Sequence, residues 1–201
     1  MNDMWYADKR DLVKWGTLVH LASRESLQLI VQVPFLRTPS QDCRLRVSRE
    51  GQPEAVAEVW EFFRNVHAIT ALGSRIGRRI VVLGDSFCPD NRSAYRGGIA
   101  KAIQGFTEPK AVLLDPDTGL ARERRATAKH ATHEDVQAIW RILNPGDWLV
   151  LYQHAPRAKE WQEPARDSFR QACGAQAVVM FTAEQIAVDV ALFAAQKALD
   201  S

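Results

Sequence analysis

Two carboxylates separated by a proline follow a short apolar run near the middle of the chain. The run 111–114 predicts a buried strand, and Asp115, Pro116 and Asp117 follow it directly. Ligands of open α/β sheets bind beyond the carboxyl ends of the strands. The segment also fits a turn, since proline fixes φ and Gly119 accepts positive φ. We therefore take Asp115, Pro116 and Asp117 as candidate catalytic residues at a turn.

Polar side chains follow two further predicted strands. Asp85 comes after the apolar run 80–83, and His154 comes after the run 148–152. Each of them alone is an ordinary turn residue. If the strands are parallel, however, both side chains lie at the same edge as Asp115. We expect this edge to hold the functional site, with His154 among the catalytic residues.

The first predicted helix spans residues 8–23 and begins with acidic and basic side chains. Asp8 is a suitable N-cap, and Asp11 adds an acid to the first turn. The helical spacing predicts an inward face made of Leu12, Trp15, Val19 and Ala22. Lys14 lies one residue from that face. We expect it to reach an anionic group at the edge of the sheet.

Short apolar strands alternate with amphipathic helices along the chain. The predicted strands are 27–35, 80–83, 111–114, 148–152 and 177–181. The predicted helices are 8–23, 54–72 (ended by Gly73 and Gly77), 93–104, 133–143, 160–173 and a last one opened by Thr182 with Gln185 as its capping partner. This alternation predicts an α/β fold: a Rossmann-like, doubly wound, mostly parallel sheet with helices on both faces. With no internal repeat or linker, residues 1–201 are expected to form a single domain.

Bulk composition restricts the classes of function. Hydrophobic residues make up 46% and charged residues 25% of the chain, and the net charge is +2. This balance is typical of a soluble globular protein and is too weak to argue for nucleic acid by itself. We see no signal peptide and no apolar run of membrane-spanning length. Three cysteines without a C-x-x-C pair favour a reducing, cytoplasmic location. Composition leaves the oligomeric state open.

Basic residues follow the two carboxylates. Arg122, Arg124 and Arg125 lie within eight residues of Asp117. Such a cluster either forms a solvated loop or binds phosphate groups. Its place next to the predicted site makes these arginines candidate substrate-binding residues, with nucleic acid as a possible partner.

The N-terminal stretch and the Asp-Pro pair together resemble a known family. Residues 8–18 are similar to the H-A-G-N-x-A-D-V-x-K-H-x-x-L opening of the ribosomal-RNA adenine-N6 methyltransferases, with matches at Asp11, Lys14 and Leu18. Asp115-Pro116 stands where those enzymes carry D-P-P-[Y/F]. The three-cysteine-motif partner proteins, a related methyltransferase-like group, look similar in outline.

The resemblance implies a methyltransferase-like fold that binds S-adenosylmethionine. Lys14 would approach the methionine carboxylate of this cofactor, with Asp11 and Asp85 also on the cofactor side. Asp115-Pro116 would hold the exocyclic amine of a flipped base against the sulfonium methyl group. Methyl transfer of this kind depends mainly on alignment of the two reactants.

The chain departs from that family at two positions. Val33-Pro34-Phe35-Leu36 stands where a glycine-rich turn should admit the cofactor, and Asp117-Thr118 replaces the aromatic residue that should stack on the base. If Phe35 fills the space beside Lys14 and Asp115, no room is left there for an adenosine. The two alternative functions described next are then better supported than methyl transfer.

Two other functions are compatible with the same residues. Asp85, Asp115 and Asp117, together with His154, could bind Mg²⁺ or Mn²⁺ for hydrolysis of a phosphoester. The chain could instead be a non-catalytic, methyltransferase-fold binding protein. His130 and His133 match no zinc motif, and a cap formed by Thr132 and Asp135 explains their segment, so we assign no metal ligands to them.

Overall fold

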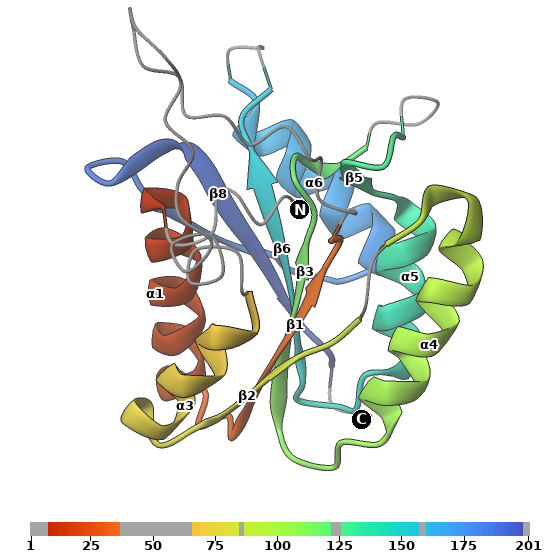
Figure 1. Cartoon of the computed structure of the whole chain (residues 1–201). Helices are drawn as coiled ribbons and strands as arrows, with labels where there is room; N and C mark the ends of the chain where they lie inside the picture. The colour runs from red at the N-terminus through yellow and green to blue at the C-terminus, as the bar shows by residue number, and fades with distance from the viewer. Residues whose placement is uncertain (1–7, 37–65, 85–86, 122–125, 157–159, 199–201) are drawn as a thin grey trace, which may run out of the picture.

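The computed structural model describes residues 8–36, 66–84, 87–121, 126–156 and 160–198. Within these ranges a six-stranded sheet in the order β2-β1-β3-β6-β8-β7 forms the middle layer (Figure 1). Its strands are β1 (Leu29–Pro34), β2 (Arg79–Val82), β3 (Lys110–Asp115), β6 (Trp148–His154), β7 (Val179–Ala183) and β8 (Ala187–Gln196). The first four strands of this order are parallel, whereas β8 runs antiparallel to β6 and β7. The predicted mostly parallel α/β sheet is confirmed.

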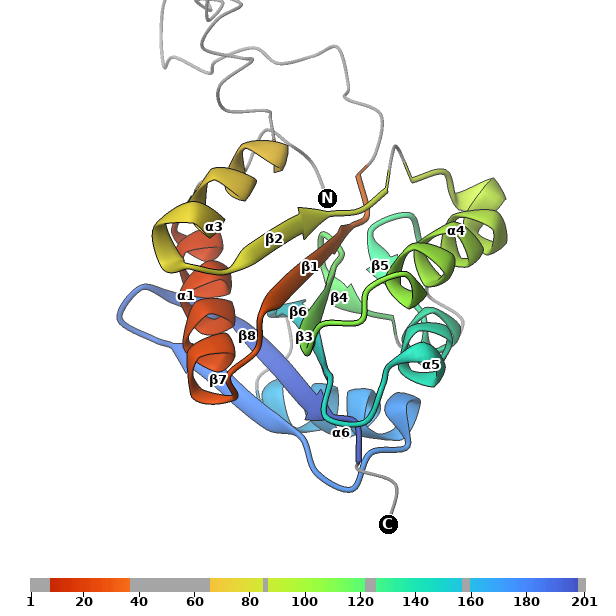
Figure 2. The ribbon, with the colours of Figure 1, turned by 90° about the horizontal axis from the view of Figure 1, so that it is seen from below.

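Helices cover both faces of the sheet (Figures 1 and 2). One face carries α1 (Lys9–Arg24) and α3 (Thr70–Ile76); the other carries α4 (Arg92–Gln104), α5 (His133–Ile142) and α6 (Gln162–Cys173). Two short 3₁₀ turns, η2 (Val66–Ile69) and η3 (Pro89–Asn91), and a two-stranded ribbon of β4 (Gly119–Leu120) and β5 (His130–Ala131) complete the elements. Every residue of β1 and β3 is buried, as expected for parallel strands covered on both faces. Within the described ranges, no helix is both long and apolar enough to cross a membrane.

Helix α1 has the predicted position but a different inward face. Asp8 caps it by accepting hydrogen bonds from the backbone N–H groups of Arg10 and Asp11, as expected. Leu12, predicted to point inward, is 61% exposed. The buried side chains are Asp11, Val13, Lys14, Trp15, Leu18, Leu21 and Ala22. Asp11 and Lys14 point inward because they have charged and hydrogen-bonding partners inside the protein. With these two residues inward, the helix places Leu12 in solvent.

One predicted helix boundary is wrong, and another lies outside the described residues. Gly73 does not end its helix: α3 continues through it and ends at Gly77, whose φ is 63°. Residues 37–65, which include most of the predicted helix 54–72, fall outside the described residues. The predicted helices 8–23, 93–104, 133–143 and 160–173 are present, and α5 begins with the capping box of Thr132 and Asp135.

The predicted helix opened by Thr182 is wrong. Thr182 belongs to β7, and the following segment forms β8, between β6 and β7. Alanines give this segment a high helix propensity, but residues 190–195 are buried with neighbouring strands on both sides. Burial in the sheet outweighs the local preference.

Candidate functional site

The carboxyl edge of the sheet contains a topological switch point between β1 and β3. The chain leaves β1 for β2 on one side, then returns to form β3 on the other side. Residues Pro34 and Asp115 are paired in the parallel register, so both strands end side by side. A doubly wound sheet binds its ligand in the crevice at this point.

At the switch point Lys14 joins the two acids that the sequence proposed for the site. Its Nζ lies 2.7 Å from Asp11 Oδ1 and 2.9 Å from Asp115 Oδ2. The exposed fractions are 7% for Asp11, 4% for Lys14 and 1% for Asp115. Burial lowers the pKa of Lys14, but the two carboxylates outweigh it and the net pKa is raised, so the ammonium group stays charged. Lys14 reaches an anionic group at the sheet edge, as expected.

Two neighbours complete this buried network. Gln32 Nε2 donates a hydrogen bond of 2.6 Å to the Asp115 oxygen that also accepts from Lys14. The amide oxygen of Gln32 is buried and has no hydrogen-bond partner among the described residues. The Tyr152 ring centroid lies 4.9 Å from Lys14 Nζ, and burial raises the pKa of its phenol, which stays protonated. The contacts of Asp115 are therefore directed into the protein.

On the other face of the sheet, Phe35 fills the space beyond the end of β1. It is 2% exposed, and its ring centroid lies 5.1 Å from that of Phe87 and 5.8 Å from that of Tyr95. The Tyr95 hydroxyl donates to the Pro34 carbonyl, which holds the aromatic group against the strand end. The adjoining Gly84 has φ of 95°, and a Cβ there would lie 2.9 Å from the Tyr95 hydroxyl oxygen. Side chains thus occupy this side of the switch point.

Gln153, near the end of β6, holds the turn after Asp115 against that strand. Gln153 accepts a hydrogen bond of 2.9 Å from the backbone N–H of Leu120 and donates one of 2.9 Å to the carbonyl of Thr118. Between them, Gly119 has φ of 104°, and a Cβ on it would lie 2.2 Å from Gln153 Oε1. The glycine of the Asp-Pro-Asp-Thr-Gly segment is therefore required by close packing as well as by backbone conformation.

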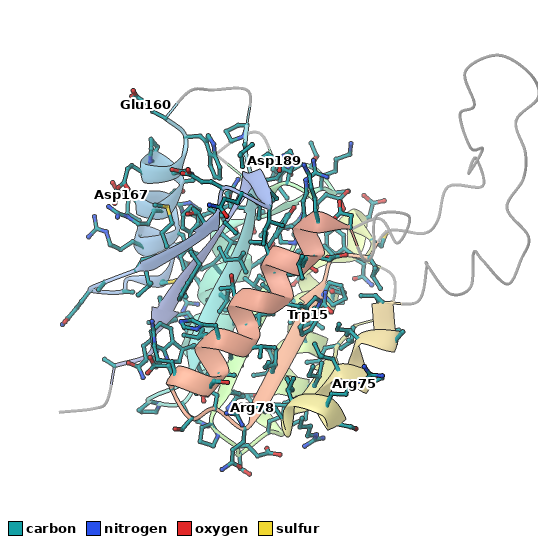
Figure 3. The ribbon with its side chains drawn as sticks, turned by 90° about the vertical axis from the view of Figure 1, so that its left-hand side faces the viewer. Trp15, Arg75, Arg78, Glu160, Asp167 and Asp189 are labelled. Carbon is teal, nitrogen blue, oxygen red and sulfur yellow. The ribbon has the colours of Figure 1, made fainter. Side chains whose placement is uncertain are left out.

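His154 belongs to a second polar network at the same edge. Its Nε2 lies 3.2 Å from Asp189 Oδ2, and its Nδ1 lies 3.1 Å from the carbonyl oxygen of Ala155. Arg10 donates to Asp189 through Nη2 at 2.5 Å and through Nε at 3.1 Å, and it also bonds to Asp8 at 3.0 Å. Figure 3 shows Asp189 at the end of the molecule where α1 begins.

Arg10 sets the electrostatics of this second network. Burial raises the pKa of Asp189, but hydrogen bonds and charge from Arg10 outweigh it, and the net pKa is lowered. The sequence did not identify Arg10 and Asp189 as site residues. The available signal was a single charge in the apolar segment that forms β8, which was assigned to a helix.

A cleft of about 310 Å³ opens beside this network. It lies between the β4–β5 ribbon, the end of β6 and the start of α6, and its walls comprise Thr118, Leu120, His130, Gln153, His154, Ala155, Pro156, Trp161, Pro164, Ala165 and Ser168. His130 has a lowered pKa, caused by burial and then by the charges of Arg92 and Lys129. The cleft is the open part of the edge, in contrast to the closed switch point.

The predicted site residues thus separate into groups. Asp11, Lys14 and Asp115 form the buried network together, whereas His154 lies in the second network. Pro116 and Asp117 continue from β3 towards the β4–β5 ribbon, and the charge of Asp117 acts on His130. Asp85, Arg122, Arg124 and Arg125 fall outside the described residues.

A metal site finds no support in the part of the chain that the structure describes. No group of three His, Cys, Asp or Glu side chains there is placed to hold a metal ion. His133 instead lies with Nε2 3.0 Å from the Ser168 hydroxyl.

Comparisons with known proteins find a likeness in structure and none in sequence. No family model matches the chain, and no curated protein matches it in sequence. The crystal structure of a "putative methyltransferase" from Thermobifida fusca YX is similar, with a TM-score of 0.48 and 10% sequence identity, over 95% of this chain and 81% of that chain. At this level of similarity the likeness assigns no activity.

Proposed function

We propose that this chain is a methyltransferase-like protein that binds nucleic acid or a nucleotide-like partner at the carboxyl edge of its sheet without transferring a methyl group. The observation that carries the proposal is the closed switch point. Lys14 and Asp115, which would face the cofactor and the base there, and Phe35, which fills the other face of the strand end, are each at most 4% exposed.

The described residues do not fit S-adenosylmethionine at the switch point. Lys14, the cation proposed for the methionine carboxylate, already bonds to two carboxylates. A third carboxylate would add like-charge repulsion in a buried site, where charges are costly unless they are paired. On the other face of the sheet, the space beyond the end of β1 is filled by Phe35 and its aromatic neighbours, which leaves no room for an adenosine there.

The same contacts disfavour Mg²⁺ or Mn²⁺ at Asp115. One carboxylate oxygen accepts hydrogen bonds from Lys14 and Gln32 at 2.9 and 2.6 Å. A divalent ion on that oxygen would lie close to the charged ammonium group of Lys14. The metal-dependent hydrolase is therefore the weaker alternative.

The partner is proposed from the basic cluster. Arg122, Arg124 and Arg125 lie in the chain between Ala121, which follows β4, and β5. Both strands of this ribbon contribute to the wall of the cleft. Three arginines at this place favour contacts with phosphate groups, which bind nucleic acid without reading its sequence.

Isothermal calorimetry against S-adenosylmethionine and its demethylated product tests the absence of methyl transfer. We expect no saturable heat with either compound at millimolar concentration. Saturable binding at micromolar concentration would overturn the proposal and favour a methyltransferase.

Charge reversal tests the partner. The unaltered chain should bind short duplex DNA or single-stranded RNA at low salt, and changing Arg122, Arg124 and Arg125 to Glu should abolish that binding. Arg75→Glu with Arg78→Glu is the matched control, because both arginines lie at the opposite end of the molecule from Asp189 (Figure 3). The proposal fails if the unaltered chain binds neither nucleic acid, or if the control weakens binding as much.

A further inference from the structure

The cleft beside β6 has the dimensions of a site for a small molecule. Its volume of about 310 Å³ is at the lower end of the range of roughly 300–1,000 Å³ typical of ligand pockets. It is built by the ribbon, β6 and α6. Lys14, Asp11 and Asp115 are not among its lining residues, so it is distinct from the switch point.

The walls combine an apolar surface with a few polar groups. The apolar part consists of Leu120, Ala155, Pro156, Trp161, Pro164 and Ala165. Among the described residues, no aspartate or glutamate lines the cleft. The amide of Gln153 already bonds to the backbone of Thr118, Leu120 and His154, and the Thr118 hydroxyl donates to the Lys129 carbonyl at 2.9 Å. The two histidines remain as the groups able to recognise a ligand by charge or hydrogen bonding, with Ser168 beside them.

His130 presents an N–H group that the protein does not use. The backbone N–H and the hydroxyl of Thr127 lie 3.4 and 2.9 Å from its Nδ1. A backbone N–H can only donate, so Nδ1 is the acceptor, and the ring proton of the neutral imidazole is on Nε2. Within the described residues no hydrogen bond involves Nε2. His130 therefore offers one free donor.

When its ring is protonated, His154 adds positive charge to the same cleft. Its two nitrogens face the Ala155 carbonyl and the Asp189 carboxylate, and both of these groups can only accept. Only the imidazolium form donates to both. Asp189 is shared with Arg10, so the carboxylate that faces His154 also offsets a second cation.

We propose that the cleft binds a small organic anion, with its single carboxylate or phosphate group accepting from His130 Nε2, attracted by the protonated ring of His154, and its apolar body against Trp161 and Leu120. An unused donor and a ring that is cationic when protonated favour an oxyanion, and none of the described lining residues is a carboxylate. This site goes beyond the proposed nucleic-acid binding and does not depend on it.

Titration of the full chain with simple probes tests the proposal. Phenyl phosphate and benzoate carry the two oxyanions on the same apolar ring, benzyl alcohol carries the ring without the charge, and inorganic phosphate carries the charge without the ring. We expect saturable one-to-one binding of phenyl phosphate or benzoate, and the tighter of the two identifies the preferred group. Binding of the alcohol and of inorganic phosphate should be at least about tenfold weaker. Equal affinity for the alcohol, or no saturable binding of either aromatic anion at millimolar concentration, would overturn the proposal.

Variants locate the binding. His130→Phe removes the donor while keeping a ring, and should weaken binding of the anion by about tenfold to a hundredfold. Ala165→Phe fills the cleft from α6 and should abolish it, which keeps the test decisive if His130→Phe does not fold. The control is His20→Phe, because His20 is exposed on α1 and is not a lining residue. Unchanged affinity in both cleft variants would refute the site.

The chain with Arg122, Arg124 and Arg125 changed to Glu separates the two proposals. It should still bind the aromatic anion, because these arginines are not needed for the cleft chemistry described here. Retained anion binding in that variant supports a site independent of nucleic acid. Loss of anion binding there would contradict the assignment to His130 and His154.

Discussion

The two polar regions of the carboxyl edge differ in how many of their charged and hydrogen-bonding groups are paired within the protein. At the switch point, Asp115 is 1% exposed and Gln32 is fully buried, and the ammonium group of Lys14 is shared between two carboxylates. In the cleft, the His154 side chain is 34% exposed, and no described residue bonds to Nε2 of His130. Both regions were expected from their place at strand ends. Place alone therefore does not distinguish a binding site from a structural one; unused donors and accessible space do.

The closed region has a clear structural task. Lys14 on α1 bonds to Asp115 at the end of β3, residues that are 101 positions apart in the chain. Buried ion pairs are weak evidence for net stability, but loss of one partner leaves an uncompensated charge. The network thus fixes the position of α1 against the sheet and resists substitution at any one member.

Removal of the shared cation should have the largest effect. In Lys14→Met two buried carboxylates lose their partner, so we expect the free energy of unfolding to fall by about 3–5 kcal/mol. Denaturant unfolding measures this change. Arg170→Met, which breaks an exposed ion pair with Asp167 on α6, is the control and should cost less than about 0.5 kcal/mol. Similar small costs for both variants would show that the switch point is not a buried structural network.

The turn that connects the two regions should be the next most sensitive. Gly119→Ala places a Cβ against Gln153 at positive φ, and we expect a loss of about 2–4 kcal/mol in the free energy of unfolding. Gly97→Ala is the matched control: no atom lies within 4 Å of its Cβ position in α4, so helix propensity should stabilise it by about 0.5–1 kcal/mol. If Gly119→Ala is as stable as the control, the lock between the ribbon and β6 does not exist.

Arg10 should contribute a smaller, pH-dependent stability. Because the pKa of Asp189 is lowered in the folded protein, its contribution is present above the unfolded pKa of about 4 and is lost as pH falls through the folded value. Arg10→Gln should therefore lower stability at neutral pH by at most about 1 kcal/mol. The difference from the unaltered chain should shrink below about pH 4. Unfolding curves at several pH values measure it; a difference that grows in acid would contradict the assignment.

Residues that only line the cleft should matter least for stability. Ser168→Ala loses the contact with His133 but gains helix propensity in α6, and we expect a change within about 0.5 kcal/mol. Thermal unfolding checks this. A large loss would mean that the cleft is structural in the same sense as the switch point.

Much of the fold was predictable because the signals were local. Buried apolar runs marked β1, β3 and β6, and the helical spacing with Asp8 as the cap marked α1. The approach of Lys14 to an anion at the sheet edge followed from its distance from the inward face. Leu12 was assigned to the wrong side because the inward pair Asp11 and Lys14 is polar, and apolar spacing alone does not reveal it.

The rest depended on contacts that the local sequence does not contain. The β4–β5 ribbon is held by Gln153 and has only two residues in each strand. Strands this short show no periodic pattern that would predict them. Arg10 and Asp189 are 179 positions apart, and their meeting requires β8 to be a strand. The alanines of that segment favour a helix when they are considered alone.

The position of β8 has a consequence for the order of folding. This strand comes after every other strand in the chain, yet it is inserted between β6 and β7. Until it docks, β6 is an open edge and β7 has no partner, which is the kind of intermediate that pairs with other chains. We therefore expect nascent or partly unfolded molecules to aggregate through β6. Docking of β8 should prevent this, because it pairs with the open edge of β6.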